Sequence, residues 1–500
     1  MRIHKHSIFL LSAALLLATL LLRPINIPDE ARYLSVSVGM WNSGHWWVPT
    51  LDGMPYFHKP PLFYWLTGLV YGLSGGCIEA ARLVSWAAGL CAMGVLAATM
   101  RRHLQHGEQA ANWALLFLAS VPLWYLGSQY ANLDMLVASC ISMAVCLLAS
   151  DLMAPHLRWR IAGYLMMGLG TMAKGLIGFV LPMLVLAPWA LWCLGWRSAL
   201  RLAWIPGWLL VLGVCAPWFT VMESEFPGFA HYFFILHHVQ RFASGGFNNV
   251  MPWPFYIAVL LVLNLPWTPT LLWLSAKPSQ ARETGDAARH LQRLALCWVG
   301  AITLFFSLPA SKLLGYILPV VPGLALAIGP ALARQASQGS RWPRALVVLG
   351  SVICVAMIFG MNMDGGKSNH TLIKAVAQEW RPGDALVFDN SFTFDVPLML
   401  RLPPPTPVFL DHPMEPQKQD SWRRELVEAA EFAPAQGAKA LRPVSDWAQV
   451  RCAAPRTWIV YDIQAPMLLT ERKGLPVIGR SDRFEAVLFQ APADCKRPQP

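Results

Sequence analysis

The 500-residue chain is 55% hydrophobic and only 13% charged, and its formal net charge at neutral pH is +11. Soluble domains carry about 25% charged residues, so this composition excludes an ordinary soluble protein. Many of the Lys and Arg residues lie in short segments between apolar runs, a pattern that reports membrane orientation and argues against nucleic-acid binding.

Long apolar runs recur from the first line of the sequence to about residue 361. A helix needs about 20 mostly apolar residues to cross a bilayer, and hydropathy predicts about eleven crossings here. We therefore expect an α-helical polytopic membrane protein with about 11–13 transmembrane helices. The candidate spans are 7–22, 80–100, 110–127, 134–150, 158–172, 174–195, 202–219, 253–274, 294–309, 313–332 and 345–361.

The first run follows the basic segment MRIHKH, and no small-residue cleavage site comes after it. We therefore expect a retained signal-anchor helix whose N-terminus is cytoplasmic. The cytoplasmic loops of multi-spanning membrane proteins carry an excess of Lys and Arg. The basic loops here contain Arg101 and Arg102, Arg158 and Arg160, Arg197 and Arg201, and the segments 282–293 and 334–344.

Placing these loops inside puts Asp29, Asp134, Lys174, Lys312, the loop 223–252 and everything after Asn362 on one outer, periplasmic face. The run 61–76 does not fit this scheme, because a full crossing there would place Arg101 and Arg102 outside. This run is either a short, tilted or re-entrant helix or a place where the positive-inside rule fails locally, and both interpretations remain open.

The composition becomes Pro-rich and charged after Asn362, and short β-type runs appear at 385–390, 406–410, 457–462 and 484–490. Helical patterns near 368–380 and 421–432 alternate with them. We therefore expect a transmembrane domain over 1–361, with a first outer loop over 23–60, and a periplasmic α/β domain over 362–500. Cys452 and Cys495 are candidates for a disulfide if this region is periplasmic, whereas the other cysteines are expected to pack as small hydrophobes.

The first outer loop gathers charges at the membrane surface. Asp29, Glu30, Arg32 and Tyr33 are followed by an amphipathic stretch with three tryptophans, which predicts an interfacial helix. The segment YFHKPPLFYW then brings in Lys59. Ionisable groups at membrane depth are costly and mark functional sites by default, and here carboxylates and an amine collect where an anionic lipid headgroup would lie.

The order of these motifs resembles that of the lipid A 4-amino-4-deoxy-L-arabinose transferases, within the polyprenyl-phosphate-dependent, multi-spanning glycosyltransferases of GT-C type. PDEARY at 28–33 is followed by PYFHKPPLFYW at 55–65. The resemblance continues through NLD at 132–134, MAKGLIG at 172–178, HHVQRF at 237–242 and SKLLGYILPVVPGLAL at 311–326. Together these motifs cover most of the membrane region in the same order.

The resemblance implies transfer of an amino sugar from undecaprenyl phosphate to a lipid A phosphate, with inversion at the anomeric carbon. The carrier phosphate leaves as an anion, so the transition state needs fixed cations, for which Lys59, Arg241 and Lys312 are the candidates. A lipid A phosphate is already ionised, and Asp29 and Asp134 would then orient the acceptor or the sugar ammonium; a hydroxyl acceptor would instead require Asp29 as a base. Substrate-binding roles are implied for Glu30, Arg32, Tyr33, Tyr56, Lys174, His238, Lys312 and Tyr316.

Simpler structural roles compete with several of these assignments. Glu30 is also a candidate to orient Arg32 or to cap a helix, and Asp134 is a candidate N-cap. Lys174 fits a residue that snorkels from a helix end, which we favour slightly. The three tyrosines, Tyr33, Tyr56 and Tyr316, fit interfacial anchors as well as phosphate-binding hydroxyls.

Two positions depart from the pattern of the resembled family. His58 stands where Glu is common before the Lys of the KPP motif, and His237 stands where an acidic residue is usual. Both changes remove negative charge, so the identity of the donor sugar and the presence of a metal site do not follow from the resemblance. His58, with His231, His237 and His238, is a candidate ligand of a divalent metal, although no tight spacing demands one and surface histidines explain the pattern more simply.

Other functions in and outside this class remain in competition. Glucosamine as the sugar, or a protein or glycan hydroxyl as the acceptor, would use similar motifs. A transporter of a lipid-linked sugar is disfavoured, because transporters place polar groups near the bilayer midplane within inverted repeats. The expected partners are the undecaprenyl-phosphate-linked amino sugar, lipid A and membrane lipids, with no nucleic acid.

Overall fold

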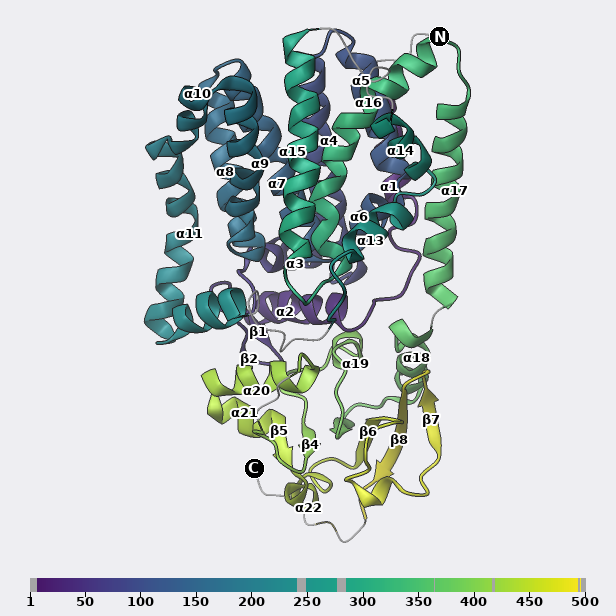
Figure 1. The fold of residues 1–500 in the computed structure, drawn as a ribbon. Helices are drawn as coiled ribbons and strands as arrows, with labels where there is room; N and C mark the ends of the chain where they lie inside the picture. Colours follow the sequence, from purple (N-terminus) through teal and green to yellow (C-terminus); the bar gives the residue numbers. More distant parts are fainter. Residues whose placement is uncertain are drawn as a thin grey trace.

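The computed structural model describes residues 7–240, 249–276, 285–363, 365–415, 419–492 and 495. Figure 1 shows a bundle of long helices above a smaller part that contains a sheet, which we call the C-terminal part (residues 365–495). Helix α2 lies across the end of the bundle that faces the C-terminal part. We call this the site end of the bundle, because the candidate residues of the first outer loop lie there.

The bundle contains helices of very different length. They are α1 Ser7–Leu17, α4 Arg82–His103, α5 Gly107–Ser120, α6 Pro122–Gln129, α7 Leu133–Met153, α8 Leu157–Lys174, α9 Ile177–Leu194, α10 Trp196–Leu200, α11 Ile205–Glu225, α13 Phe255–Leu263, α14 Thr268–Ala276, α15 Asp286–Ser307, α16 Val321–Ser337 and α17 Trp342–Met363. The 3-10 segments η1 Glu79–Ala81, η2 Arg201–Ala203 and η5 Leu314–Val320 and the π-helix η3 His231–Gln240 connect them.

Seven helical segments in the described residues are long and apolar enough to cross a membrane, or eight if the bent pair α5 and α6 is one span. They match the expected spans at 80–100, 134–150, 174–195, 202–219, 294–309, 313–332 and 345–361. The other expected spans correspond to helices that are shorter, broken or more polar, namely α1, α5 with α6, α8, and α13 with α14.

Proline explains where two expected spans are interrupted. Helices α5 and α6 meet at 66°, and Pro122 is the first residue of α6. The run 253–274 is divided into two helices of nine residues each, and Pro266 lies between them. Proline lacks an N–H and clashes with the preceding turn, so a helix normally stops before it. A hydropathy window averages over such breaks and predicts one continuous span.

The first outer loop, 23–60, folds into helix α2 Asp29–Ser43 and strands β1 Thr50–Leu51 and β2 Met54–Pro55, and the run 61–76 forms helix α3 Leu62–Leu73. Helix α2 buries one face, and Trp41 on its other face and Trp47 after it are 38% and 51% exposed, as expected for an interfacial helix. Helix α3 has 12 residues, about 18 Å at 1.5 Å per residue. It is therefore too short to cross a hydrocarbon core of about 30 Å by itself.

The C-terminal part has a mixed sheet of six strands in the order β5-β4-β3-β6-β8-β7. Strands β5, β4, β3 and β6 are parallel, and β8 and β7 continue the sheet antiparallel. The strands are β3 Ala385–Asp389, β4 Val408–Leu410, β5 Leu441–Pro443, β6 Arg456–Asp462, β7 Val477–Arg480 and β8 Phe484–Gln490. The helices are α18 His370–Glu379, α19 Asp395–Met399, α20 Trp422–Phe432, α21 Pro434–Ala440 and α22 Trp447–Val450, with η6 Gly365–Lys367, η7 Val444–Asp446 and η8 Thr470–Arg472.

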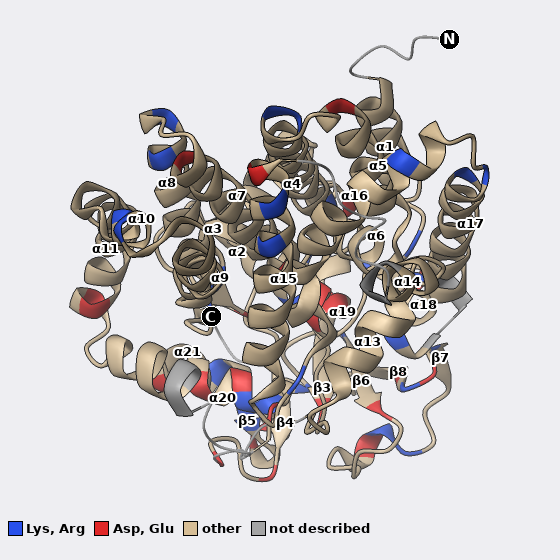
Figure 2. Ribbon diagram, turned by 45° about the horizontal axis from the view of Figure 1, so that its top comes forward, with Lys and Arg blue, Asp and Glu red and all other residues tan. Residues whose placement is uncertain are grey.

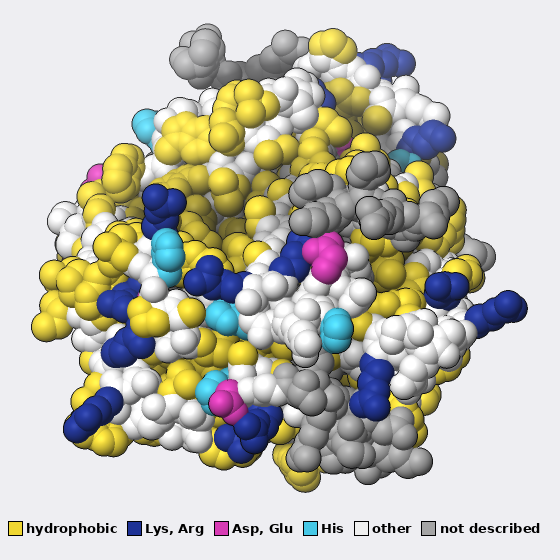
Figure 3. Space-filling model, turned by 90° about the horizontal axis from the view of Figure 1, so that it is seen from above, with side chains coloured by type: hydrophobic (Ala, Val, Ile, Leu, Met, Phe, Trp, Pro, Cys, Tyr) yellow, Lys and Arg dark blue, Asp and Glu magenta, His cyan; other side chains and the backbone are white. Residues whose placement is uncertain are grey.

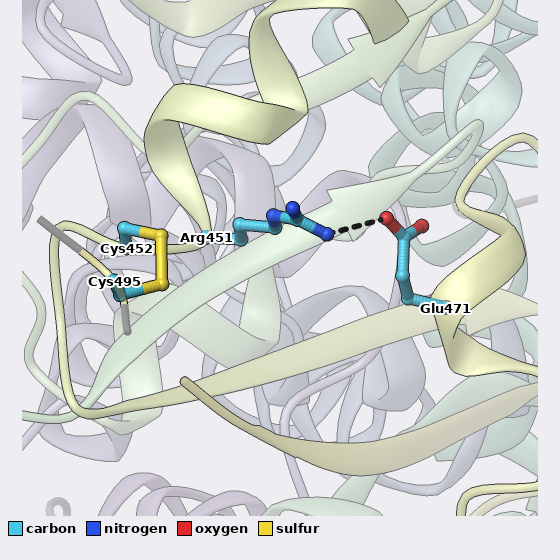
Figure 4. The surroundings of a disulfide bond; sticks show 4 residues. All are labelled: Arg451, Cys452, Glu471 and Cys495. Carbon is cyan, nitrogen blue, oxygen red and sulfur yellow. Dashed lines mark hydrogen bonds and ion pairs between the residues drawn. A yellow bond between two sulfur atoms is a disulfide. The ribbon is translucent and has the colours of Figure 1, made fainter. Parts of the chain in front are cut away.

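The strands and helices expected in this region are confirmed at the four predicted runs and the two predicted helices. Short elements such as β5, of three residues, were not expected. A strand of three residues is too short for its side chains to show a period of two, so only its pairing with β4 defines it. Cys452 and Cys495 form a disulfide, and Arg451 beside it pairs with Glu471 at 3.1 Å (Figure 4).

Charge is distributed unevenly between the ends of the bundle. Figure 2 shows Lys and Arg mainly near helix ends and in the C-terminal part. Figure 3, which views the end of the bundle opposite the C-terminal part, shows many Lys and Arg side chains and few Asp or Glu side chains. Helices α4, α10 and α16 carry basic residues in their last turns.

The bundle and the C-terminal part are joined by polar and aromatic contacts. Both carboxylate oxygens of Asp52, in the β1–β2 turn, accept the N–H of Thr406 at 3.0 Å. Arg401 donates to the carbonyl of Gly76 at 3.1 Å. Both contacts come from the segment that joins α19 to β4, and they hold it against the β1–β2 turn and the residues that follow α3.

Candidate functional site

The first turn of α2 carries the acidic pair that opens the first outer loop. Asp29 and Glu30 are the first two residues of this helix. The free N–H groups at a helix N-terminus favour negative charge, so two carboxylates are well placed there. Their surroundings differ sharply, because the Asp29 side chain is 39% exposed and that of Glu30 is fully buried.

Glu30 holds the centre of a buried ion network. Its carboxylate accepts from Arg23 at 2.8 and 3.0 Å and from Arg82 at 2.8 and 3.1 Å. It also accepts the backbone N–H groups of Asn26 at 2.9 Å and Ala131 at 3.0 Å. Burial alone would raise the pKa of Glu30, but the two guanidinium groups outweigh it and lower the pKa to about 2.

Both oxygens of Glu30 are therefore occupied by protein donors. The sequence suggested that Glu30 binds substrate, orients Arg32 or caps a helix. The structure instead pairs Glu30 with Arg23 and Arg82, and Asp29 is the carboxylate that contacts Arg32. Sequence reasoning assigned no role to Arg23 or Arg82, because no local spacing connects either arginine to the acidic pair.

Arg32 lies between a carboxylate of the bundle and one of the C-terminal part. Its Nη2 contacts Asp29 Oδ1 at 2.5 Å and donates to the Tyr33 hydroxyl at 3.2 Å, and its Nη1 pairs with Glu425 of α20. Burial raises the pKa of Glu425 to about 7, although Arg32 opposes this. The guanidinium thus joins α2 to the C-terminal part and holds the Asp29 carboxylate in place.

Tyrosine side chains surround this pair. Tyr33 and Tyr56 are buried, at 8% and 2% exposure, so neither faces lipid as an interfacial anchor. The Tyr33 ring lies 6.2 Å from that of Tyr64, whose buried hydroxyl has no hydrogen-bond partner in the described structure. Burial raises the pKa of Tyr56, so its hydroxyl stays neutral and able to donate a hydrogen bond.

Asp134 lies in the first turn of α7, and Asn132, not Asp134, caps that helix by accepting the Asp134 N–H at 2.9 Å. The Asp134 carboxylate forms an ion pair with Lys174, the last residue of α8. The Lys174 Nζ also lies 4.4 Å from the centre of the Tyr316 ring. A Cβ on Gly315 would lie 2.1 Å from Asp134 Oδ2, so only glycine lets η5 approach so closely.

Two structural alternatives from the sequence are therefore wrong. Asp134 is not the N-cap of α7. Lys174 does not snorkel to an interface, since its side chain is only 9% exposed and pairs with that carboxylate. The motifs NLD, MAKGLIG and SKLLGYILP thus meet at one point of the site end.

Lys59 follows His58 in the loop before α3 and is half-buried. His58 is itself buried, and its Nε2 lies 2.8 Å from Glu428 Oε2 of α20. The same Glu428 carboxylate accepts from the Tyr232 hydroxyl at 2.7 Å and from Arg424 Nε at 2.6 Å. Neither Glu425 nor Glu428 was expected at the site, because each lies more than 360 residues from its partner in the first loop.

Two further cations, Lys312 and Arg241, were candidates for binding the carrier phosphate. Lys312 is buried, and its Nζ donates to the carbonyls of Met251 at 2.9 Å and Pro309 at 2.5 Å, so it supports the loop that precedes α13. Arg241 lies outside the described residues, as does the side chain of His238.

The residues described by the structure contain no group of three or more His, Cys, Asp or Glu side chains that could hold a metal ion. His58, the candidate metal ligand, is engaged with Glu428 instead.

Glu30 connects the two carboxylate centres of the site end. Asp29 is its neighbour in α2, and the N–H of Ala131, three residues before Asp134, donates to its Oε1. The two acidic motifs are therefore held in a fixed relation by one buried side chain. This arrangement provides two carboxylates with paired cations, and such groups can orient an ammonium, a phosphate or an attacking oxygen.

An open cavity of about 700 Å³ lies beside this centre, between the second half of α2, the β1–β2 hairpin and residues 392–404. Trp46, Trp47 and Phe394 line it, together with the polar groups of Asp52 and Arg401. None of the described candidate residues is part of its lining, so the cavity adjoins the charged centre without containing it.

Comparison with known proteins supports the resemblance seen in the motifs. Residues 58–220 match the family described as dolichyl-phosphate-mannose-protein mannosyltransferase. The undecaprenyl phosphate-alpha-4-amino-4-deoxy-L-arabinose arabinosyl transferase of Pseudomonas aeruginosa is 32% identical over 319 residues, 63% of this chain and 57% of that protein. The protein named arabinosyl transferase 1 of the same type, from Sodalis glossinidius, is 36% identical over 309 residues, which are 60% of this chain and 53% of that protein. The matched region therefore spans little more than half of these relatives.

Solved structures with the same fold are also known. The crystal structure of ArnT from Cupriavidus metallidurans bound to undecaprenyl phosphate superposes with a TM-score of 0.77 at 23% identity and covers 98% of each chain. The apo state of the same protein gives a TM-score of 0.76 at 22% identity. The chain is thus a multi-pass membrane protein with the ArnT-like GT-C fold, and the resemblance to the lipid A aminoarabinose transferases is confirmed in sequence and in fold.

Proposed function

We propose that this membrane protein, which shares its fold with ArnT and its motif order with the aminoarabinose transferases, is a glycosyltransferase. It moves an amino sugar, 4-amino-4-deoxy-L-arabinose, from undecaprenyl phosphate to a phosphate of lipid A. The proposal is supported most by Glu30, which follows Asp29 in α2 and accepts the N–H of Ala131, so it relates the ion pair of Asp29 to the separate motif that carries the ion pair of Asp134.

In this proposal the reaction is an in-line displacement at the anomeric carbon. An oxygen of the acceptor phosphate forms the new bond, and the bond to the carrier phosphate breaks with its electron pair. Negative charge therefore builds on the carrier phosphate, and Lys59 and Arg241 stabilise it. Asp29, held by Arg32, and Asp134, held by Lys174, orient the acceptor and the sugar ammonium rather than removing a proton.

We also propose that the site end and the C-terminal part face the periplasm of a bacterial inner membrane. The many Lys and Arg side chains at the opposite end fit the cytoplasmic side under the positive-inside rule. The disulfide between Cys452 and Cys495 fits an oxidising compartment. Replacing anionic charge on lipid A with a zwitterion would weaken binding of cationic peptides such as polymyxins.

Purified full-length protein, incubated with undecaprenyl-phosphate-linked aminoarabinose and lipid A, tests the activity directly. We expect a modified lipid A and free undecaprenyl phosphate in equal amounts. Product with a glucosamine donor, or with a hydroxyl acceptor in place of lipid A, would redirect the proposal within the same reaction class. No product with any of these pairs would contradict it.

A further inference from the structure

Helix α20 of the C-terminal part brings two carboxylates to the site end. Glu425 and Glu428 are three residues apart, so they lie on the same face of the helix. Their side chains are only 9% and 16% exposed, which shows that this face is turned into the contact with the bundle. Figure 1 places α20 at the junction of the two parts, just below β2.

The Glu428 carboxylate is held by several donors at once. His58 and Tyr232 both reach its Oε2, at 2.8 and 2.7 Å, and Arg424 reaches its Oε1 at 2.6 Å. Hydrogen bonds to an ionised acceptor are shorter and about twice as strong as neutral ones. The His58 ring also stacks on Tyr56 at 4.6 Å, so its orientation is fixed on two sides.

The two partners of Glu428 belong to different segments of the bundle. His58 immediately precedes Lys59, and Tyr232 lies in the π-helix η3. One carboxylate therefore ties the loop that carries Lys59 to η3.

Apolar packing attaches α20 to the bundle without help from Glu428. The Phe57 ring packs against Phe432 at 4.9 Å, and Tyr232 packs against the same phenylalanine at 5.2 Å. Phe226 completes this cluster at 6.2 Å from Phe432. The attachment thus has its own apolar basis, and the carboxylate adds direction to the polar groups around it.

We propose that Glu428 is a positioning residue of the transfer reaction, which acts through His58 and Tyr232 to hold the Lys59 loop and η3 in the geometry that binds the departing phosphate. The C-terminal part then belongs to the active centre and is more than a cover over it. This inference rests on the proposed function for its kinetic consequence, but its consequence for phosphate binding can be measured separately.

The test uses full-length protein with Glu428→Gln, which keeps the shape of the side chain and removes its charge. Glu471→Gln is the matched control, because Glu471 also pairs with an arginine of the C-terminal part, Arg451, and lies in η8, which contacts β8. We expect the Glu428 variant to lose about 10- to 100-fold in kcat with a smaller change in the donor KM, since a displaced cation weakens transition-state stabilisation most. Glu428→Asp should recover part of the rate.

A double-mutant cycle with His58→Asn separates positioning from a general structural role. If Glu428 acts through His58, the double variant will be no slower than the slower single variant, and melting temperatures will stay at the wild-type value. Rates that multiply, a melting temperature that falls together with activity, or wild-type kinetics in Glu428→Gln would overturn the inference.

Binding of undecaprenyl phosphate in detergent micelles provides a readout that does not depend on transfer. We expect about tenfold weaker binding by Glu428→Gln and unchanged binding by Glu471→Gln, because the free phosphate carries the charge that Lys59 is positioned to meet. Equal binding by wild type and Glu428→Gln would reject the positioning role. If wild type binds the lipid but transfers no sugar to any acceptor, the proposed function fails while the binding comparison still decides this inference.

Discussion

A single carboxylate, Glu30, fixes the acidic pair of α2 to the rest of the bundle. Two arginines and two backbone N–H groups use its oxygens, which leaves Asp29 as the exposed member of the pair. Removing one partner from a buried ion network costs about 3–5 kcal/mol, because the remaining charges lose their compensation. The two adjacent acidic residues therefore have different surroundings: Glu30 is enclosed by protein donors, and Asp29 is partly exposed beside Arg32.

We expect Glu30→Gln to lower the melting temperature strongly and to reduce the yield of folded protein in the membrane. Because the pKa of Glu30 is lowered from 4.5 to about 2, its contribution to stability is complete above pH 4.5 and is lost as the pH falls toward 2. Thermal unfolding of the wild type and the variant, followed between these limits, checks this. A variant as stable as the wild type at neutral pH would contradict the assigned role.

Asp29→Asn should lower the activity and leave the stability unchanged, in contrast to Glu30→Gln. The side chain is partly exposed and forms its ion pair with Arg32, so we expect an unchanged melting temperature. Activity should fall about 100-fold, with weaker use of the acceptor, because misplacement of a reacting group by about 1 Å costs rates of this order. Initial rates over a range of lipid A concentrations measure this, and a loss of kcat with an unchanged acceptor KM would instead favour a proton-abstracting role.

At the scale of elements, the close approach of η5 to the first turn of α7 depends on one glycine. A methyl group at position 315 would collide with the Asp134 carboxylate and push it away from Lys174. We expect Gly315→Ala to lower the transfer rate about 10- to 100-fold while the protein still inserts and folds. Gly213→Ala in α11 is the control, because nothing lies within 4 Å of a Cβ there. Equal rates for the two variants would contradict the proposed role of the Asp134 pair.

The turn between β1 and β2 contains Asp52, whose protonation state affects the stability of the protein. Burial raises the pKa of Asp52 from 3.8 to about 7, even though the N–H of Thr406 favours the ionised form. An acid with a raised pKa binds more protons when folded, so its contribution to stability is present below pH 3.8 and is lost as the pH rises through 7. We expect Asp52→Asn to remove this pH dependence and to be the more stable protein above pH 7, as measured by thermal unfolding across pH 5–8. A stability difference that does not change with pH would contradict this.

Hydropathy and motif order predicted much of this architecture. The spans at 80–100 and 134–150 and the strands of the C-terminal part follow from local patterns of apolar residues. The division of 253–274 and the short strand β5 do not, because a window average hides a break at one proline and a short strand is defined by its pairing.

The candidate site likewise contains some residues that the sequence identified and others that it did not. Asp134, Lys174 and Tyr316 were candidates because each lies in a recognisable motif, and Asp134 and Lys174 were expected on one outer face; their direct contact was not predicted. Glu425 and Glu428 were not expected, since they reach Arg32 and His58 from the far end of the chain and no local pattern records such pairing. Single-sequence reasoning therefore finds candidate residues that lie in motifs but misses the partners that contact them from distant parts of the chain.

For the whole molecule, the disulfide closes a loop of 43 residues at the far end of the C-terminal part. In the chain-entropy account, a cross-link over this separation stabilises the folded form by about 4 kcal/mol. We expect Cys452→Ser to make the C-terminal part sensitive to protease while α20 keeps its place through the Phe57 and Phe432 contact. Activity of the variant is measured before and after protease treatment, which shows whether the intact C-terminal part is needed. Cleavage of the C-terminal part without loss of activity would contradict the role given to α20.

The central claim is that one charged centre at the site end transfers an amino sugar to lipid A. Mass spectrometry of lipid A tests this most directly, in cells that carry the gene, cells that lack it, and cells that carry Asp29→Asn, grown under conditions that supply the donor lipid. The account predicts lipid A with one added amino sugar on phosphate only with the wild-type gene. The same lipid A spectrum in all of these cells would contradict it.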